Sequence, residues 1–112
     1  MSNTLGTGYV EKVYENALVH CIRKSTDLAV MQQCPIKVEY DGIIVGEFFA
    51  DLLVDERVLV ELKAVSMLMN DHTAQALNYL RATGLELCLL LNFGRSKVEI
   101  KRLRPYTDWK KI

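Results

Sequence analysis

Three charged side chains interrupt the most aliphatic stretch of the sequence, FADLLVDERVLVELKA at residues 49–64. Asp51, Glu61 and Lys63 stand where a purely apolar core would hold Val or Leu. Side chains two residues apart on a strand project from the same face, so Glu61 and Lys63 share a face. Asp51 precedes a short turn and reaches that face from the neighbouring strand. Because an unpaired buried charge is costly, these residues must pair with one another or bind a cation.

Two interpretations of this cluster are open. In the first, Asp51 and Glu61 form a site of hard oxygen ligands suited to Mg²⁺ or Mn²⁺. Lys63 then holds a water molecule or stabilises a developing negative charge. In the second, Lys63 forms a salt bridge with one of the two acids at the edge of a sheet. The spacing of the residues is compatible with both.

An amphipathic helix is predicted over residues 10–22, where apolar residues recur at intervals of three and four. At about 100° per residue, Glu11 falls inside the apolar stripe of this helix, whereas Glu15 falls just beyond its edge. An acid on a buried helix face is unusual unless it meets a metal or a base. We therefore add Glu11 to the candidate site. The alternative is that Glu11 reaches solvent at the start of the helix.

A second helix is predicted from about Ser66 or Asn70 to Thr83, with Gly84 as its C-terminal stop. Its polar residues His72, Gln75 and Tyr79 are spaced i, i+3, i+7 and line up along one side. The core stripe is expected to consist of Ala74, Leu77 and Leu80. A glutamine amide on the polar side can accept a hydrogen bond from a nucleophilic water or donate one to a phosphate. A histidine in this position is more typical of an ordinary surface residue.

Five strands are predicted from aliphatic and β-branched runs bounded by turn signals, at residues 36–40, 44–54, 57–64, 85–93 and 97–103. Pro35 is placed before the first strand, and Asp41-Gly42 forms a hairpin turn. The strand at 85–93 is apolar on both faces and is expected to lie inside the sheet. The order α-β-β-β-α-β-β predicts an α/β (α+β) fold in which helices flank a mixed central β-sheet.

The length of 112 residues is enough for one domain. Cys21, Cys34 and Cys88 are odd in number and widely spaced, which indicates neither a zinc site nor a disulfide framework. We expect free thiols, two of them in the core, in a reducing compartment. The sequence shows no signal peptide and no apolar run near the roughly 18 residues of a membrane span. A cytoplasmic protein with no membrane contact is therefore expected.

The formal net charge is zero, but residues 95–112 contain seven of the 14 bases and only two of the 14 acids. These bases are Arg95, Lys97, Lys101, Arg102, Arg104, Lys110 and Lys111. A basic C-terminal segment beside an acidic body is compatible with a contact to nucleic acid. The alternative is a solvated final strand and tail.

The cluster resembles the D…(E)xK signature of the PD-(D/E)XK nuclease superfamily, with AD at residues 50–51 and ELK at 61–63. The stretch GTGYVEKVYENAL is similar to the start of the GxxExxY proteins, because Gly8, Glu11 and Tyr14 supply the named positions. The likeness continues through VGEFFADLLV, VELKAV, HTAQALNYLRATGLELCLLLNFG and KRL, which together cover nearly the whole chain. The resemblance implies a restriction-endonuclease-like core.

The resemblance also implies a phosphodiesterase site that uses Mg²⁺ or Mn²⁺. Asp51, Glu61 and the backbone carbonyl of Leu62 would be metal ligands, and Glu11 would complete the shell directly or through water. Lys63 would orient the attacking water or stabilise the transition state, in keeping with the way metals activate water.

Further resemblance concerns the helix that follows the ELK strand. Gln75 and Tyr79 look like the QxxxY element of RecB-like nucleases, which positions the site and the nucleic acid. With the basic residues Arg95, Lys97, Lys101 and Arg102, Tyr79 is expected to contact the substrate.

The chain departs from the family at two places. Members usually carry a helix before the glycine-rich turn, whereas only residues 1–5 precede that turn here. We therefore expect a single domain over residues 1–112 that lacks this helix, which would either expose apolar surface and favour a homodimer or leave a shortened, inactive copy. The proline of the superfamily name is replaced by Ala50.

Three functions are consistent with these patterns. The first is a metal-dependent nuclease that hydrolyses phosphodiester bonds, in DNA rather than RNA. The second is a non-catalytic module on the same fold that binds nucleic acid or another protein. The third is a structural salt-bridge cluster with a basic tail that binds a partner. Metal affinity separates the first from the third, and metal-dependent cleavage separates the first from the second.

Overall fold

A computed structural model describes residues 8–105 of the chain. The elements are α2 (Glu11–Ser25), β1 (Val30–Tyr40), β2 (Ile43–Val54), β3 (Val58–Lys63), α3 (Asn70–Thr83), β4 (Leu87–Asn92) and β5 (Glu99–Leu103). This order confirms the predicted α-β-β-β-α-β-β succession. Residues 108, 110 and 111 of the predicted basic tail lie outside the described residues.

The five strands form one mixed sheet in the order β1-β2-β3-β4-β5. The pairs β1–β2, β2–β3 and β4–β5 are antiparallel, whereas β3 and β4 are parallel. The parallel pair is joined through α3, because parallel neighbours need a crossover connection. β4 has a neighbour on each side, as the apolar run of residues 85–93 predicts.

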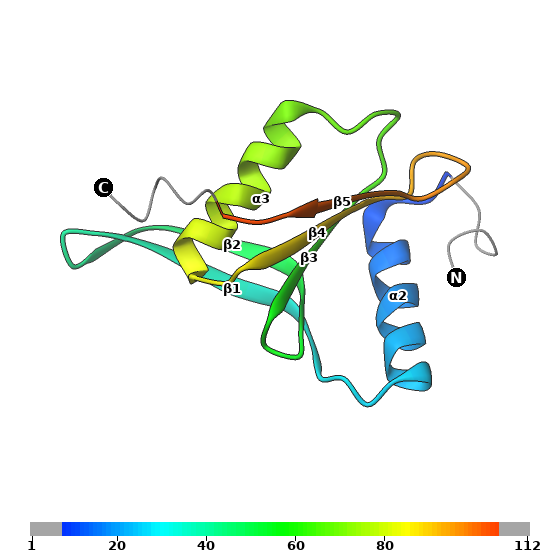
Figure 1. Cartoon of the computed structure of the whole chain (residues 1–112), viewed down its shortest axis with the longest axis horizontal. Helices are drawn as coiled ribbons and strands as arrows, with labels where there is room; N and C mark the ends of the chain where they lie inside the picture. The colour runs from blue at the N-terminus through cyan, green and yellow to red at the C-terminus, as the bar shows by residue number, and fades with distance from the viewer. Residues whose placement is uncertain (1–7, 106–112) are drawn as a thin grey trace.

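The two helices cover opposite faces of the sheet (Figure 1). Successive residues of β3 alternate between the faces, since Leu59 packs in the cluster beneath α3 while Val60 and Leu62 pack in the cluster with Tyr14 of α2. Glu61 and Lys63 are in phase with Leu59 and therefore belong to the α3 face. The fold thus presents both charged residues of the ELK strand to one helix, as their spacing predicts.

Two tight turns connect the first three strands. Asp41 and Gly42 both have positive φ, 53° and 76°, as the favoured two-residue hairpin turn requires. Asp55 and Glu56 repeat this conformation with φ of 54° and 56°, although neither is glycine. This second turn returns the chain from the Asp51 strand to the Glu61 strand.

The predicted start of the first strand is wrong. β1 begins at Val30, six residues before the predicted start, and Pro35 lies inside it, paired with Phe49. Proline lacks an N–H and is tolerated in a strand at the edge of a sheet, where that group would find no ladder partner. β1 is such an edge strand. The glutamines that precede Pro35 therefore belong to the sheet.

The hairpin of β1 and β2 projects beyond the rest of the molecule (Figure 1). β1 pairs with β2 along almost its whole length, but β2 pairs with β3 only from Leu52 to Val54. Large apolar side chains are exposed along the projecting part, namely Tyr40, Ile43, Ile44, Val45, Phe48 and Phe49. The two strands of the site, β2 and β3, therefore separate immediately before Leu52.

Cys21, Cys34 and Cys88 are free thiols, as predicted, but only Cys88 is buried. The expectation of two core cysteines is wrong because Cys34 lies on the edge strand and Cys21 on the partly exposed side of α2. Burial, followed by the nearby charges of Glu61 and Asp51, raises the pKa of Cys88 to about 12. Within residues 8–105, no helix combines the length and apolar character needed to span a membrane.

Candidate functional site

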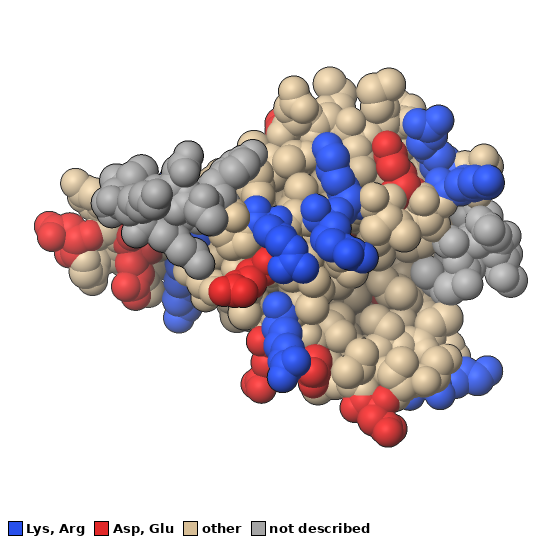
Figure 2. Space-filling model, in the orientation of Figure 1, with Lys and Arg blue, Asp and Glu red and all other residues tan. Residues whose placement is uncertain are grey.

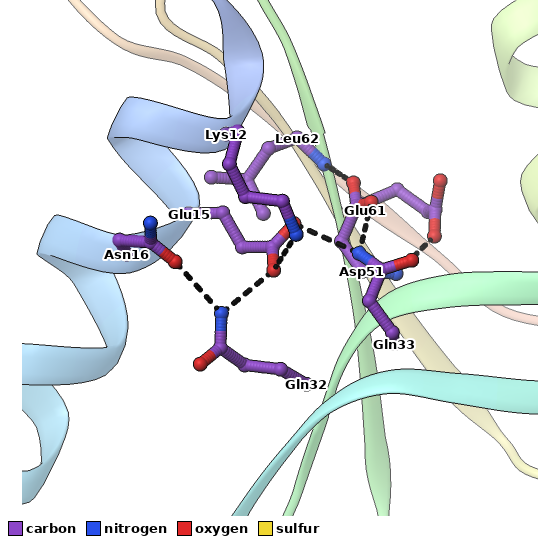
Figure 3. A network of polar contacts seen from close by, with 8 residues as sticks. All are labelled: Lys12, Glu15, Asn16, Gln32, Gln33, Asp51, Glu61 and Leu62. Carbon is purple, nitrogen blue, oxygen red and sulfur yellow. Dashed lines mark hydrogen bonds and ion pairs between the residues drawn. The ribbon is translucent and has the colours of Figure 1, made fainter.

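Asp51 and Glu61 hold each other through two reciprocal hydrogen bonds at the point where β2 and β3 separate (Figure 3). The backbone N–H of Asp51 donates to Glu61 Oε1 at 2.8 Å. In return, the backbone N–H of Leu62 donates to Asp51 Oδ2, also at 2.8 Å. Each carboxylate thus accepts a backbone N–H that would otherwise donate to a carbonyl of the neighbouring strand, where the backbone pairing of β2 with β3 has ended. We name these two residues with their two hydrogen bonds the acid pair.

Both members of the acid pair are harder to ionise than ordinary carboxyl groups. Burial, then repulsion from Asp51, raises the pKa of Glu61 to about 8. Burial also raises the pKa of Asp51, and the charges of Glu15 and Glu11 add to the effect. Lys63 acts in the opposite direction on Glu61 but does not offset the burial. A bound cation would stabilise the charged form of both groups.

The backbone carbonyl of Leu62 faces the same side of β3 as the acid pair. In a strand, the N–H and C=O of one residue point to the same neighbour. The N–H of Leu62 points to β2, where it meets Asp51, so its carbonyl points there as well. The next carbonyl, that of Lys63, faces β4 instead and accepts the N–H of Phe93 at 2.8 Å. The orientation of Leu62 is thus compatible with the ligand role expected of its carbonyl.

Lys63 and Gln75 meet across the gap between β3 and α3. Lys63 Nζ donates to Gln75 Oε1 at 3.4 Å, and the contact is exposed. No salt bridge joins Lys63 to an acid among residues 8–105; the ion pair found there joins Lys12 and Glu15. The interpretation of the cluster as a closed salt bridge of Lys63 is therefore wrong.

The buried acid of α2 is Glu15, not Glu11 as predicted. Glu15 is 3% exposed, whereas Glu11 is exposed. The helix packs through Tyr14 and Val19 rather than through Val10, so its buried side is turned towards Glu15. Glu11 still lies beside the site, because its Oε2 accepts the N–H of Ala64 at 3.2 Å, directly after the ELK sequence.

Gln33 links Glu15 to the acid pair (Figure 3). Its amide Nε2 donates to Glu15 Oε1 at 3.0 Å and to Asp51 Oδ1 at 3.5 Å. Gln33 has a φ of 54°, which is uncommon for a residue other than glycine, and the pairing of β1 with β2 passes over Gln33 and Asp51 without a shift of register. Residues held in sparsely populated backbone conformations of this kind cluster at functional sites. The available sequence signal for this role was the pair of glutamines at positions 32 and 33, in a stretch for which no helix or strand was predicted.

The remaining oxygen of Glu15 is satisfied from two directions. Lys12 Nζ lies 3.0 Å from Oε2, and Gln32 Nε2 donates to the same oxygen at 2.7 Å. The buried carboxylate is therefore fully hydrogen-bonded, as a buried charge requires. Its position near the edge of the apolar stripe was the only sequence signal for this role.

Asn92 fixes the chain as it leaves the ELK strand, a role that sequence reasoning missed. Its side chain is fully buried and makes hydrogen bonds to the N–H of Val65 at 3.0 Å and the C=O of Val65 at 2.9 Å. It also bonds the N–H of Gly94 and the carboxylate of Glu99. A Cβ at Gly94 would overlap the backbone of Val65, so glycine is required there. A polar residue at the end of an otherwise apolar strand was the available signal.

The polar side of α3 differs from the prediction. Tyr79 is only 7% exposed and belongs to the core, while Ala74 is exposed and Ala76 is buried in its place. The helix is rotated because the large ring of Tyr79 packs against Phe48, with ring centroids 5.9 Å apart. His72 accepts the N–H of Met69 at 3.0 Å and so closes the first turn of the helix. Of the predicted polar residues His72, Gln75 and Tyr79, it is Gln75 that forms a hydrogen bond with Lys63, beside the acid pair.

The basic residues Arg95, Lys97, Lys101 and Arg102 lie on β5 and in the loop before it, and β4 alone separates Lys101 from Glu61 of the acid pair in the ladder. Figure 2 shows Lys and Arg side chains over β5 and near the loop that precedes it. β5 is separated from β2 by two strands. Lys101 opposes Leu90 and Arg102 opposes Leu89 in the ladder, so the two side chains leave opposite faces of the sheet. Lys101 turns towards α3 and donates to Thr73 Oγ1 at 3.2 Å.

Together, the structure places Glu11, Asp51, Glu61, Lys63 and Gln75 around the end of β3. Among residues 8–105, no group of three or more His, Cys, Asp or Glu side chains is arranged to hold a metal ion by itself. The arrangement provides two adjacent carboxylates, one backbone carbonyl and one amine. This set can hold a hard cation that keeps part of its shell for water or a phosphate oxygen.

Residues 1–103 match the family described as the PD-(D/E)XK nuclease superfamily. Because this match covers most of the 112 residues, the chain belongs to the PD-(D/E)XK nuclease superfamily. The resemblance of AD…ELK to the superfamily signature is thereby confirmed at this level. No curated protein has a sequence that matches this chain.

Two crystal structures share the fold. SSO0001 is 12% identical with a TM-score of 0.66, and the match covers 89% of this chain and 53% of that one. An alkaline exonuclease from Laribacter hongkongensis, LHK-Exo, is 14% identical with a TM-score of 0.64, covering 89% of this chain and 58% of that one. The chain thus spans little more than half the length of either protein. These likenesses confirm the predicted mixed sheet flanked by helices.

Proposed function

We propose that this chain is a metal-dependent nuclease that hydrolyses phosphodiester bonds, in DNA rather than RNA. The observation that carries the proposal is the acid pair at the separation of β2 and β3, with Lys63 two residues beyond Glu61. Membership of the nuclease superfamily supports it, and so does the shared fold of a protein named as an exonuclease. Within the superfamily, the GxxExxY motif at Gly8, Glu11 and Tyr14 supports assignment to that smaller group.

The acid pair fits Mg²⁺ or Mn²⁺ by the chemistry of its donors. Mg²⁺ is commonly held by one or two carboxylates together with water and substrate phosphates, not by a cage made only of protein. Asp51 and Glu61 would be those carboxylates, with the carbonyl of Leu62 on the same side of β3. Glu11, which is exposed and bonded to Ala64, would act through a water molecule. The raised pKa values of both acids are in keeping with a place for positive charge.

When bound, the ion would lower the pKa of a water molecule and neutralise phosphate charge. Lys63 would orient that water or stabilise the charge that develops on the phosphate. Gln75 would hold the Lys63 amine in place by accepting its hydrogen bond. Gln33 would keep Asp51 in position through the hydrogen bond that its amide donates. The roles of these residues follow from their contacts to one another.

The basic residues of the β4–β5 loop and of β5 would bind the phosphate backbone away from the reacting bond. Arg95, Lys97, Lys101 and Arg102 are all exposed. Contacts of lysine and arginine with phosphates supply affinity that depends on salt but not on sequence. This role requires a substrate long enough to reach from β3 to the far edge of the sheet.

Calorimetric titration of Mn²⁺ tests the metal site first. The wild type should bind Mn²⁺ saturably, and Asp51→Asn should lose that binding because it removes one charged ligand. Asp55→Asn is the matched control, since Asp55 is an exposed turn acid four residues away and asparagine tolerates its positive φ. Equal binding by the wild type and Asp51→Asn would contradict the assignment of the acid pair.

Cleavage is then measured with end-labelled DNA and RNA, single-stranded and duplex, in Mg²⁺ or Mn²⁺. Lys63→Ala should abolish cleavage while leaving Mn²⁺ binding nearly intact, because the amine activates but does not ligate. Lys24→Ala, at the far end of α2, should cleave as the wild type does. Equal metal-dependent cleavage by wild type and Lys63→Ala would remove the role given to Lys63. Faster cleavage of RNA would reverse the preference for DNA.

A non-catalytic binding module is the second candidate. The exposed apolar residues of the β1–β2 hairpin favour it, because surfaces of this kind mark interaction sites on other proteins. The same residues support the expectation of a homodimer. Nucleic-acid binding without cleavage under any of the metal conditions above would select this alternative.

A further inference from the structure

A groove of about 1060 Å³ lies between α3 and the projecting hairpin of β1 and β2. One wall is formed by strand residues at 37–39 and by Phe48, and the other by the outward side of α3, including Gln75 and Asn78. Figure 1 shows α3 above the part of the sheet from which the hairpin projects. A volume of this size is ample for a nucleotide-sized ligand.

The groove is continuous with the candidate site. Gln75 lines the groove and also accepts the hydrogen bond of Lys63. Lys63 in turn follows Glu61 of the acid pair on the same face of β3. A molecule bound at the acid pair can therefore extend past Gln75 into the groove.

An aromatic surface lines the groove. Phe48 is 46% exposed, and its ring rests against Tyr79 with a centroid distance of 5.9 Å and an angle of 41° between the ring planes. Tyr79 is buried and belongs to the core beneath α3. The core thus supports one side of the Phe48 ring while the rest of the ring is available to a ligand. Exposed aromatic rings of this kind stack on nucleobases of any sequence.

The polar lining of the groove suits a base better than a phosphate. Lys37 and Arg81 are balanced by Glu39 and Asp71, so the groove has no net charge to attract the backbone. The amides of Gln75 and Asn78 each offer a donor and an acceptor, which match the edges of nucleobases. The sugar–phosphate chain is better accommodated at Lys63 and at the exposed bases of β5.

We propose that this groove binds an unpaired nucleobase next to the scissile phosphate, with Phe48 as its stacking surface. The proposal rests on the proposed nuclease function, because it places the phosphate at the acid pair. A base inside a duplex is stacked on both faces and cannot enter, so the preferred substrate is single-stranded nucleic acid or a frayed end. Phe48 is then a residue that determines specificity.

The test compares Phe48→Ala with Phe49→Ala. Phe49 is 50% exposed on the same hairpin but projects from the opposite face of the strand, which makes it a matched control. Affinity for fluorescent single-stranded DNA, single-stranded RNA and duplex DNA is measured by anisotropy in EDTA, so that cleavage does not interfere. Phe48→Ala should weaken single-strand binding by about 5-fold to 150-fold, the range of alanine substitutions at stacking residues, while Phe49→Ala changes it less than about two-fold.

A second variant keeps the test informative if Phe48→Ala fails to fold. Phe48→Trp retains the stacking surface, and its added fluorescence should be quenched by single-stranded oligonucleotides. Absence of quenching, equal losses in Phe48→Ala and Phe49→Ala, or tighter binding of duplex would each overturn the proposal. Self-association that Phe48→Ala disrupts would also overturn it, because the groove would then hold a second copy.

The outcome separates this proposal from the nuclease proposal. Loss of single-strand binding in Phe48→Ala without any cleavage by the wild type would support the base site and refute the nuclease. Metal-dependent cleavage by the wild type together with unchanged binding by Phe48→Ala would do the reverse. Comparison of the DNA and RNA oligonucleotides shows which sugar the site accepts.

Discussion

Replacement of Glu61 by glutamine should make the metal-free protein more stable at alkaline pH. The pKa of Glu61 is raised in the folded state from an ordinary 4.5 to about 8. Between these pH values the folded state binds more protons than the unfolded state, so the free energy of unfolding falls as pH rises. At about 1.4 kcal/mol per pKa unit, the full loss approaches about 5 kcal/mol. Stability from this group is therefore complete below pH 4.5 and lost as pH rises through about 8.

The Glu61→Gln substitution keeps a side-chain acceptor for the N–H of Asp51 and removes the charge. The free energy of unfolding, measured by urea titration in EDTA, should match the wild type near pH 4.5 and exceed it by up to about 5 kcal/mol at pH 9. Glu56→Gln is the control, because Glu56 is exposed in the β2–β3 turn and its replacement should leave the profile parallel to the wild type.

Parallel profiles for Glu61→Gln and the wild type would refute the reasoning, because they would mean that Glu61 ionises normally in the fold. The same urea titrations are then repeated with Mn²⁺ in place of EDTA. A cation at the acid pair favours the charged carboxylates, so it should flatten the pH dependence of the wild type but not that of the variant. A wild-type profile that Mn²⁺ does not change would count against a metal at this pair.

Three further predictions concern other parts of the molecule. In a urea titration, Asn92→Leu should lower the free energy of unfolding by about 3 kcal/mol or more, because the N–H and C=O of Val65 lose their buried partners. The control Asn78→Leu, on the exposed side of α3, should change the free energy of unfolding by less than about 0.5 kcal/mol. Cys88 should resist iodoacetamide in the native protein and react only after unfolding, which mass spectrometry of labelled peptides would show, because burial suppresses its thiolate. If the hairpin mediates a homodimer, Ile43→Lys should yield a monomer in sedimentation velocity, and an unchanged sedimentation coefficient would exclude the hairpin as the interface.

Most of the fold could be predicted because its elements are marked by local signals. The turn at Asp41-Gly42, the stop at Gly84 and the apolar run of β4 each indicate structure from a few neighbouring residues. The early start of β1 could not be predicted in this way. It depends on β1 lying at the edge of the sheet, which makes Pro35 acceptable there, and that placement is a property of the whole sheet.

The candidate site was predictable where it lies on strands and less so where it lies on helices. A strand has only two faces, so the spacing of Glu61 and Lys63 fixes their common side. A helix can take any rotation about its axis, and the rotation is set by how its large apolar side chains pack on the sheet. In α2 that packing buries Glu15 rather than Glu11. The hydrogen bonds of Gln33 to Glu15 and of Asn92 to Val65 join segments far apart in the sequence, for which local patterns give no signal.

The hydrogen bonds of the acid pair bear on which residues a copy of this chain without catalysis would keep. Asp51 and Glu61 complete the pairing of β2 with β3 through acceptor oxygens, so a copy without catalysis would need only an acceptor at each position, which asparagine and glutamine also supply. Lys63 and Gln75 share one exposed contact and support no backbone group. Selection for folding alone would therefore retain an acceptor oxygen at positions 51 and 61 but not the two negative charges, and it would release the lysine and the glutamine. Folding alone thus does not account for the two charged acids together with Lys63 and Gln75 in this chain.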